Sequence, residues 1–442
     1  MATTIKIRNI GPIQEADLIN LNKVNVFMGP QSSGKSTIAK IISYCTWVEK
    51  DVATSQSLNE YQKSDDYFKN HLEKYHKLKG YFKPNSYISY KSNVIEMEYD
   101  AGKFSIEWKD RYAYKRSKIS YIPSERNMVI LPEVKKVEFG HTYIRSFLFD
   151  WLDARKKYSK DTKMPVLNLN MGYFYNETLD EDYITGNQNN EIYNILLPNA
   201  SSGLQSVTPL LTMINYLTDW LYNEDGGKIS FEREQKQKKT IQNLFQGEGI
   251  INLTEKLQSV VDGWQEKKID DKIDEMKKKK KKVREIEDVL TKDDFFNHFI
   301  NTYTSLFTTH NSQLIIEEPE QNLFPATQRD LIYHLLEKCV NSEKDHRLTI
   351  TTHSPYILYA LNNCMMGKLV FDKMDESDKN SLACKRSLVN PENVSIYQIE
   401  NGVLKNIQQE EDGLIGKNYF DDNMKALMDD FYKLLEYYGD EE

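Results

Sequence analysis

Between positions 24 and 37 the chain reads VNVFMGPQSSGKST, and this stretch decides the fold. Its first five residues are mostly apolar and β-prone, which predicts a buried strand that ends at Gly29. Four residues separate Gly29 from a second glycine, and Lys35 is then followed by the helical apolar spacing of Ile38, Ile41 and Ile42. A strand, a glycine-rich loop and a helix in this order predict an α/β fold.

The loop has the spacing of a P-loop, a glycine-rich turn that holds phosphate. Glycines at both ends let backbone N–H groups approach phosphate oxygens, because no Cβ stands in the way. Lys35 is expected to reach the β- and γ-phosphates of a nucleotide, and the Ser36 hydroxyl is expected to bind Mg²⁺. An ordinary Gly-Ser turn is the simpler alternative, but a strand before the loop and a helix after it favour the P-loop. The predicted nucleotide-binding residues of this loop are Gly29, Pro30, Gln31, Ser32, Ser33, Gly34, Lys35, Ser36 and Thr37.

A second stretch, LIIEEPE at positions 314–320, places two carboxylates at the end of an apolar strand. The carboxyl ends of parallel strands form the edge at which α/β proteins bind ligands. We expect Glu317 to lie beside Mg²⁺ and Glu318 to polarise the attacking water as a general base. Alone, this acidic strand end would be interpreted as a solvated surface, but a P-loop upstream favours the catalytic interpretation.

Two further segments are candidates on weaker grounds. His353 follows the predicted strand 348–351, where an imidazole can contact the γ-phosphate or its attacking water. A histidine after a strand is usually structural, but its position after the acidic pair favours a catalytic role. An amphipathic helix opens near position 202, and small residues at a helix N-terminus can bind an anion. Taken alone, this opening favours an ordinary serine N-cap. Its candidate residues are Ser201, Ser202, Gly203 and Gln205.

The length of 442 residues predicts two or three compact units. We expect residues 1–221 and 301–442 to form the two parts of one α/β head with a mixed sheet. Residues 222–300 between them are expected to be a helical or coiled-coil insertion, because apolar residues recur along their second half. A smaller polar insertion is expected at about 44–85, and a β-hairpin subdomain at 93–109. Further strands are predicted at 4–8, 118–123, 313–316 and 348–351 and as a hairpin at 394–407, with helices at 140–160, 202–217, 326–340 and the C-terminus.

Charge and cysteine content limit the partners and the compartment. The net charge is −8, and residues 410–442 alone carry eleven acidic side chains and three lysines, which also gives −8. The rest of the chain is therefore neutral on balance, so contact with nucleic acid needs a local basic patch. Four widely spaced cysteines form no CxxC pair, which favours a reducing cytoplasm over a disulfide scaffold or a zinc site. No apolar run is long enough to span a membrane.

Two basic segments are candidates for contact with nucleic acid. Residues 109–118 interleave basic and aromatic side chains, which can hold phosphates and stack on bases. Residues 277–282 are six consecutive lysines. Both have a simpler interpretation, because the first can be a solvated loop between strands and the second the exposed face of a coil.

In their order along the chain, the four segments resemble the nucleotide-binding head of ABC-class ATPases. They are similar to a Walker A motif, a signature loop, a Walker B motif with its catalytic glutamate, and a switch histidine. Four stretches resemble more closely the soluble AAA-type ATPases related to the overcoming-lysogenisation-defect (OLD-like) family, and more distantly RecF and SMC heads. Many of these proteins belong to bacterial anti-phage systems, and this chain is similar to the ATPase subunits of PARIS-like or Septu-like systems. The four stretches are IKIRNIGPI at 5–13, YIPSERN at 121–127, SSGLQS at 201–206 and EEPEQNLFP at 317–325.

This resemblance implies ATP and Mg²⁺ as cofactors and a head-to-tail homodimer, or a higher oligomer built on it. Lys35 and Ser36 of one copy would enclose one ATP with Ser202 and Gly203 of the other. Two departures stand out: the magnesium acid is Glu317 where most ABC proteins have aspartate, and Ser124-Glu125-Arg126 occupies the place of the Q-loop glutamine.

Relatives that cleave DNA carry a TOPRIM nuclease after the switch histidine, and this chain lacks both the room and the pattern. The resemblance therefore implies an ATP-driven switch in anti-phage defence that controls a separate nuclease or toxin. The alternative is a RecF- or SMC-like ATPase in DNA repair or chromosome maintenance.

The C-terminal helix carries one apolar stripe on a strongly acidic background. Its members recur at steps of four and three residues, and they are Phe420, Met424, Leu427, Phe431, Leu434 and Tyr438. Most amphipathic helices pack such a stripe on their own core, and we expect the same here. The alternative is a docking site for a basic partner or for a second copy of the chain.

Overall fold

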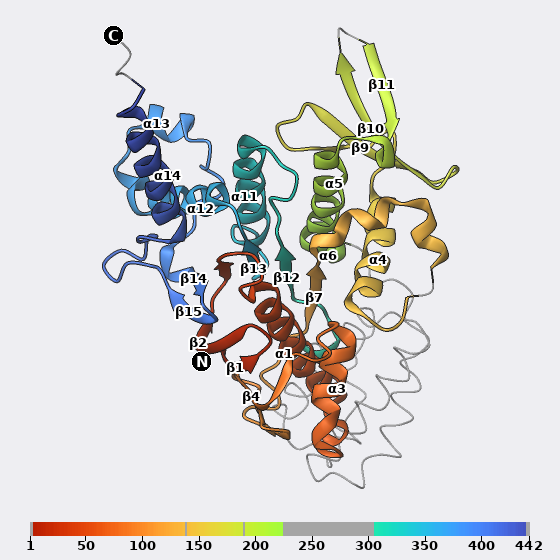
Figure 1. Ribbon diagram of the computed structural model, residues 1–442. Coiled ribbons are helices and arrows are strands. Elements are labelled where there is room, and N and C mark those ends of the chain that lie inside the picture. The colour runs from red at the N-terminus through yellow and green to blue at the C-terminus, as the bar shows by residue number, and fades with distance from the viewer. Residues whose placement is uncertain (1–2, 138, 189–190, 224–304, 439–442) are drawn as a thin grey trace, which may run out of the picture.

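The computed structural model describes residues 3–137, 139–188, 191–223 and 305–438. Nearly all of the expected insertion at 222–300, with its apolar seam and its lysine run, lies outside these residues. The described chain forms an α/β fold around a large mixed sheet, with helices on both faces (Figure 1). The predicted fold class is confirmed.

The main sheet has eleven strands among the described residues, in the order β6-β5-β4-β1-β2-β15-β14-β3-β13-β12-β7. The five neighbouring strands from β14 to β7 are parallel to one another. The strands from β6 to β2 pair antiparallel with one another in this order, and β15 lies between the two parts. The strands are β1 (Thr3–Ile10), β2 (Ile13–Leu21), β3 (Val24–Met28), β4 (Phe82–Lys91), β5 (Ile95–Asp100), β6 (Lys103–Trp108), β7 (Ser117–Ile122), β12 (Asn311–Glu317), β13 (Arg347–Thr352), β14 (Val394–Glu400) and β15 (Val403–Asn406).

The parallel part of the sheet brings distant segments to one edge. Glu317 at the end of β12 pairs with Thr351 on β13, and Thr352 pairs with Met28 at the end of β3. Because carboxyl ends of parallel strands share one edge, the loops after β3, β12 and β13 meet there. These are the three loops that carry the predicted P-loop, acidic pair and histidine.

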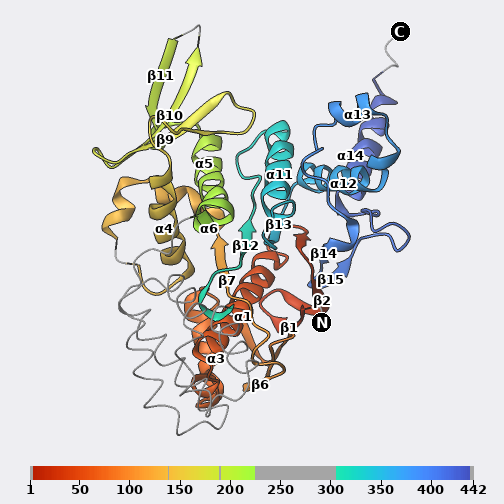
Figure 2. The ribbon, with the colours of Figure 1, turned by 180° about the vertical axis from the view of Figure 1, so that it is seen from behind.

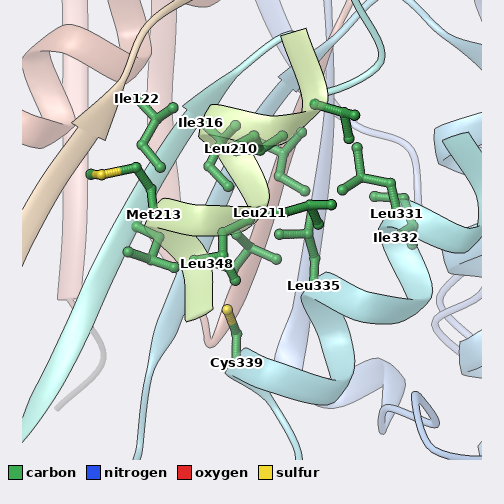
Figure 3. Close-up of a cluster of buried hydrophobic side chains, with 14 of the residues drawn as sticks. Ile122, Leu210, Leu211, Met213, Ile316, Leu331, Ile332, Leu335, Cys339 and Leu348 are labelled. Atoms are coloured by element: carbon green, nitrogen blue, oxygen red, sulfur yellow. The ribbon is translucent and has the colours of Figure 1, made fainter. Parts of the chain in front are cut away.

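Side chains alternate between the two faces of the sheet along each strand, and helices pack on both faces. Val24, Val26 and Met28 of β3 face one core, while Phe27 faces the other core with α1. Figure 3 shows α5 and α11 packing their leucines on the first face. The helices are α1 (Lys35–Ser55), α2 (Asn59–Gln62), α3 (Asp65–Tyr75), α4 (Tyr143–Ala154), α5 (Ser202–Asn215), α6 (Leu221–Asn223), α11 (Pro325–Cys339), α12 (Pro355–Val370), α13 (Glu376–Ser381) and α14 (Tyr419–Leu435).

The segment at 44–85, expected as a polar insertion, is packed against the sheet. Helix α1 continues to Ser55 and buries Tyr44, Val48 and Val52, and α3 buries Phe68 and Leu72 in the same core. The polar composition was misleading because tyrosine, histidine and tryptophan rings bury large apolar surfaces while keeping a polar atom.

A second, four-stranded antiparallel sheet was not foreseen in the sequence. It lies beside α4 and α5, and its outer hairpin projects from the molecule (Figure 2). Arg155 anchors it, because the guanidinium is buried and donates to the Asp182 carboxylate at 3.1 Å. The strands are β8 (Met164–Pro165), β9 (Met171–Asn176), β10 (Glu181–Gln188) and β11 (Glu191–Leu196).

The C-terminal helix α14 forms as predicted, but the expected packing of its apolar stripe is wrong. Asn418 and Asp421 make a reciprocal capping box that starts the helix. None of its residues is buried, and Leu427 and Phe431 are 66% and 54% exposed. Only Tyr419 and Phe420, at the helix start, pack against the main core. The stripe therefore faces outward, at the edge of the fold where α12 and α13 lie (Figure 1).

Candidate functional site

The predicted P-loop joins β3 to α1 and requires glycine at both ends. Gly29 has φ of 150°, and a Cβ there would lie 2.5 Å from the Ile399 carbonyl oxygen. Gly34 has φ of 109°, and a Cβ there would lie 2.2 Å from the Ile13 side chain. Both positions combine a left-handed backbone with no room for a side chain, so the loop stays narrow and its backbone stays accessible.

Three features of this loop suit a bound phosphate. Gly34 is the N-cap of α1 and offers no side chain to the first N–H groups of the helix, which stay available to an anion. The Ser33 hydroxyl is buried without a hydrogen-bond partner among the described residues. Lys35 points into the loop, where its Nζ donates to the carbonyl oxygens of Gly29 and Pro30 at 2.8 and 2.7 Å.

Burial lowers the pKa of Lys35 to about 8, and the nearby Glu318 and Glu320 carboxylates oppose this shift. The Lys35 ammonium donates to two neutral carbonyl oxygens, and phosphate oxygens can take their place. The loop and its lysine therefore fit the polyphosphate of a nucleotide.

Glu317, the predicted magnesium acid, is buried at the end of β12 and held from β7. Its Oε1 accepts a hydrogen bond from the Tyr121 hydroxyl at 2.5 Å, and its Oε2 accepts from the Ser124 backbone N–H at 3.4 Å. Carboxylate and hydroxyl oxygens are the ligands that Mg²⁺ prefers, so Glu317 and Ser36 fit this ion. The Ser124 contact also places the segment at 124–126 beside the acidic pair.

Glu318 and His353 come together across the ends of two neighbouring strands. Glu318 Oε1 lies 3.1 Å from His353 Nε2, and its backbone N–H donates to the Thr351 carbonyl at 2.9 Å. Glu318 has φ of 43°, a strained conformation for a residue with a side chain, which turns its carboxylate out of the strand direction. His353 holds the pKa of Glu318 below its usual value, so the carboxylate is ionised at neutral pH.

Glu320 has a structural task that the sequence did not reveal. Its Oε1 accepts from the Thr352 hydroxyl at 2.8 Å and from the His353 backbone N–H at 2.6 Å. The carboxyl is buried, which raises its pKa, and its Oε2 has no partner among the described residues. Glu320 therefore ties the loop after β12 to the loop after β13 and fixes the backbone of His353.

Arg126 is a second residue whose structural role in the site the sequence did not reveal. Its guanidinium is fully buried, and burial lowers its pKa to about 10. It donates to the backbone carbonyls of Glu317 and Glu318 at 2.8 and 2.7 Å, and to the Ser206 hydroxyl on α5 at 3.2 Å. Arg126 thus connects the acidic strand end to the helix that begins with the signature segment. The signs in the sequence were its place in the YIPSERN stretch and at the expected position of the Q-loop.

The signature segment lies next to the loop after β12 of the same chain. Ser201 and Ser202 are exposed at the start of α5, and a Cβ on Gly203 would lie 2.9 Å from the Asn322 carbonyl oxygen. The Gln205 amide does not point outward, because it donates to the Pro198 and Ala200 carbonyls at 2.7 and 2.9 Å. The exposed serines are therefore available to a second molecule, while Gln205 holds its own loop.

The basic segment at 109–118 is largely occupied by contacts within the chain. Arg111 donates to the Gln56 side chain and backbone, both at 2.7 Å, and Lys118 pairs with Asp150 at 2.6 Å. Tyr114 is buried in the core. Few of its charges and rings remain for a nucleic acid, which favours the simpler interpretation of a loop between strands. The lysine run at 277–282 lies outside the described residues.

Comparison with known proteins gives distant structural matches only. No family model matches the sequence, and no curated protein matches it. Among solved structures, the SMC head domain from Thermotoga maritima is similar at 10% identity and TM-score 0.34, covering 93% of this chain and 100% of that chain. An ATP-binding cassette of an ABC transporter in its ADP conformation matches at 10% identity and TM-score 0.28, covering 93% and 94%. The recombination mediator RecF matches at 10% identity and TM-score 0.27, covering 92% and 98%.

These matches are too distant to decide function, which rests on the site geometry. Within the described ranges, no helix is both long and apolar enough to cross a membrane.

Proposed function

We propose that this chain binds ATP and hydrolyses it with Mg²⁺. One observation carries the proposal: the glycine-rich loop that contains Lys35 and the Glu318–His353 pair lie at the same edge of the sheet. The pairing of Glu317 with Thr351 and of Thr352 with Met28 supports the proposal, because it brings the strand ends before these loops to one edge. A cation for the β/γ-phosphates and an ionised base beside them are the two groups that phosphoryl transfer to water requires.

Each residue has a role that follows from its surroundings. Lys35 binds phosphate oxygens in exchange for the carbonyls of Gly29 and Pro30, and Ser36 and Glu317 would hold Mg²⁺, which neutralises phosphate charge when bound. Glu318 accepts a proton from the attacking water, and His353 orients the Glu318 carboxylate through their 3.1 Å contact. Glu320 and Arg126 hold in place the loops that carry Glu318 and His353.

We propose that two copies enclose ATP head-to-tail, so that the serines of one copy complete the loop of the other. The exposure of Ser202 supports this arrangement, as does Phe324, which is 77% exposed beside the Asn322 loop. A large aromatic side chain left in water next to a catalytic loop is typical of a surface that another protein covers.

We propose further that ATP-driven closure of these heads controls a separate effector, a nuclease or toxin, in cytoplasmic anti-phage defence. The unpacked apolar stripe of α14 supports a protein partner or a higher oligomer. The alternative, a RecF- or SMC-like role on DNA, requires a basic surface. Of the two basic segments, residues 109–118 are largely occupied by internal contacts, and residues 277–282 lie outside the described residues.

The experiment that tests the proposal compares the purified chain with its Lys35→Ala variant. Calorimetry should show ATP affinity at least about tenfold weaker in the variant, because one charge-assisted contact to phosphate is lost. Phosphate release by the wild-type chain should require Mg²⁺, and neither DNA nor RNA should be cleaved. Equal ATP affinity in both proteins would reject the P-loop assignment. Strong stimulation of phosphate release by duplex DNA would favour the DNA-maintenance role.

A further inference from the structure

A cavity of about 200 Å³ lies between α1, α3, β7 and α4, away from the P-loop. We call it the α1–α4 cavity. Four different elements supply its walls, so it is a property of the tertiary fold. Its lining includes Ser43, Trp47, Tyr75, Ser120, Tyr121 and Tyr143.

The cavity contains a buried polar atom that nothing in the described chain satisfies. Ser120 is 3% exposed, and its hydroxyl has no hydrogen-bond partner among the described residues. A buried hydroxyl without a partner costs about 1–3 kcal/mol, so such atoms usually mark the place of a bound water or ligand. Ser43 and Ser146 add two further hydroxyls to the lining.

The remaining lining is mainly aromatic. The ring planes of Trp47 and Tyr75 lie 18° apart with centroids at 6.4 Å, and Tyr143 on α4 also lines the cavity. Two charged residues of the lining, Lys118 and Asp150, pair with each other at 2.6 Å, and the Tyr75 and Ser146 hydroxyls are hydrogen-bonded at 3.0 Å. Flat aromatic walls with a few neutral hydroxyls match a planar ring that carries donors and acceptors on its edge.

The size and the charge of the lining narrow the ligand class. The volume suits one planar ring system and is small for a complete nucleotide. An aromatic amino acid would bring an ammonium and a carboxylate group, but the charged side chains of the lining are already engaged. Lys118 and Asp150 pair with each other at 2.6 Å, and Lys50 has an interaction of its own within the chain, so the ligand's charges would be buried without compensation. A heteroaromatic base is neutral and presents several polar atoms on one edge.

One wall of the cavity leads directly to the magnesium acid. Tyr121 lines the cavity, and its hydroxyl donates to Glu317 Oε1 at 2.5 Å. A ligand that packs against Tyr121 therefore changes how firmly this hydroxyl holds Glu317.

We propose that the α1–α4 cavity binds a nucleobase, free or as a nucleoside, and that its occupancy adjusts the proposed ATPase site through the Tyr121–Glu317 hydrogen bond. The binding half of this proposal stands on the cavity alone. The regulatory half rests on the proposed ATPase function.

The binding test uses the full chain with Lys35→Ala, titrated by calorimetry with adenosine, guanosine, cytidine and uridine in turn. This background weakens the P-loop and needs no ATP turnover, so the result does not depend on whether the chain is an ATPase. At least one nucleoside should bind with one-to-one stoichiometry and Kd tighter than about 1 mM. Adding Ser120→Ala should weaken binding about fivefold or more, the worth of one hydrogen bond. Because the buried Ser120 hydroxyl has no partner among the described residues, its removal should not lower the melting temperature.

A second variant closes the cavity from outside. Ser146→Trp on the exposed side of α4 should abolish nucleoside binding, and Ser381→Trp on the surface of α13 is its matched control and should bind normally. Binding that is the same in Ser120→Ala and Ser146→Trp, or no binding of any of the four nucleosides, would overturn the site. An unchanged rate of ATP hydrolysis by the wild-type chain at saturating nucleoside would overturn the link to Glu317.

Discussion

The Nε2 atom of His353 lies 3.1 Å from the Oε1 atom of Glu318, although 34 residues separate them in the chain. Adjacent parallel strands bring the two residues together, and the Glu320 carboxylate holds the His353 backbone by accepting a hydrogen bond from its N–H group. The pair leaves Glu318 ionised and oriented, which is what a general base needs before water arrives.

Replacing Glu318 by glutamine keeps the shape of the side chain but removes its ability to accept a proton. We expect the rate of ATP hydrolysis to fall by about 10²–10⁴, while ATP affinity is retained because Lys35 is intact. Size-exclusion chromatography with ATP should then show an accumulated dimer. Glu337→Gln, on the surface of α11, is the matched control. A near-normal rate in Glu318→Gln would move the base elsewhere, with His353 as the first alternative.

The lowered pKa of Lys35 predicts that ATP binding takes up a proton at alkaline pH. Below pH 8 the lysine is already charged, and above pH 8 it must gain a proton to pair with phosphate. Calorimetry in two buffers of different ionisation enthalpy should show uptake of about a tenth of a proton at pH 7 and nearly one at pH 9. ATP affinity should weaken as pH rises above 8. Lys35→Met should lose the uptake, and Lys40→Met on the same helix should keep it.

Arg126 is expected to act as a positioning residue, because its donors hold the backbone of both glutamates without reaching the P-loop. Arg126→Lys keeps the charge but loses the planar fork, and kcat should fall about 10–100-fold with little change in KM. Arg126→Met leaves several buried carbonyls unpaired and should lower the free energy of unfolding by about 3 kcal/mol or more in urea denaturation. Arg329→Lys, at a surface ion pair, should change neither quantity. A change in KM alone would contradict this role.

The head-to-tail arrangement predicts rescue between two inactive variants. The contact between Gly203 and Asn322 means that a side chain at Gly203 would disturb its own chain, so the exposed Ser202 is the better position. Ser202→Arg should bind ATP normally but not hydrolyse it. An equal mixture with Lys35→Ala should recover about a quarter of the wild-type rate, because half of the dimers then have one intact site. No recovery at any mixing ratio would exclude a composite site.

Because the apolar stripe of α14 faces outward, we expect a double substitution in it to leave folding unaffected. Leu427→Glu with Phe431→Glu should change the free energy of unfolding by less than about 0.5 kcal/mol, because both side chains already lie in water. The ATPase rate should also persist, while assembly with the effector or beyond the dimer should be lost. Leu335→Glu on α11, which is buried, is the contrasting variant and should prevent folding. Unfolding of the α14 variant would show that the stripe packs on the chain itself.

Local sequence determined the elements that depend on nearest neighbours. The spacing from Gly29 to Lys35, the apolar strand ending at Glu317 and the hairpin turn at Ala101-Gly102 each carry their geometry in a few residues, because glycine conformations and side-chain alternation are local properties. The P-loop, the acidic strand and the position of His353 after its strand were therefore visible before the fold. The second sheet was missed because its short strands lack a continuous apolar pattern.

The tertiary structure alone decided which of these residues meet. Arg126 and Glu320 looked like ordinary charged residues, since nothing nearby in the sequence shows that each is buried against loops some 30 to 190 residues away. The apolar stripe of α14 has the same sequence pattern whether it is buried or exposed. Periodicity identifies an apolar helix face but does not show what covers that face. Long-range packing decides which charges are buried, that Glu318 pairs with His353, and that a cavity forms beside Ser120. A single sequence does not show this packing.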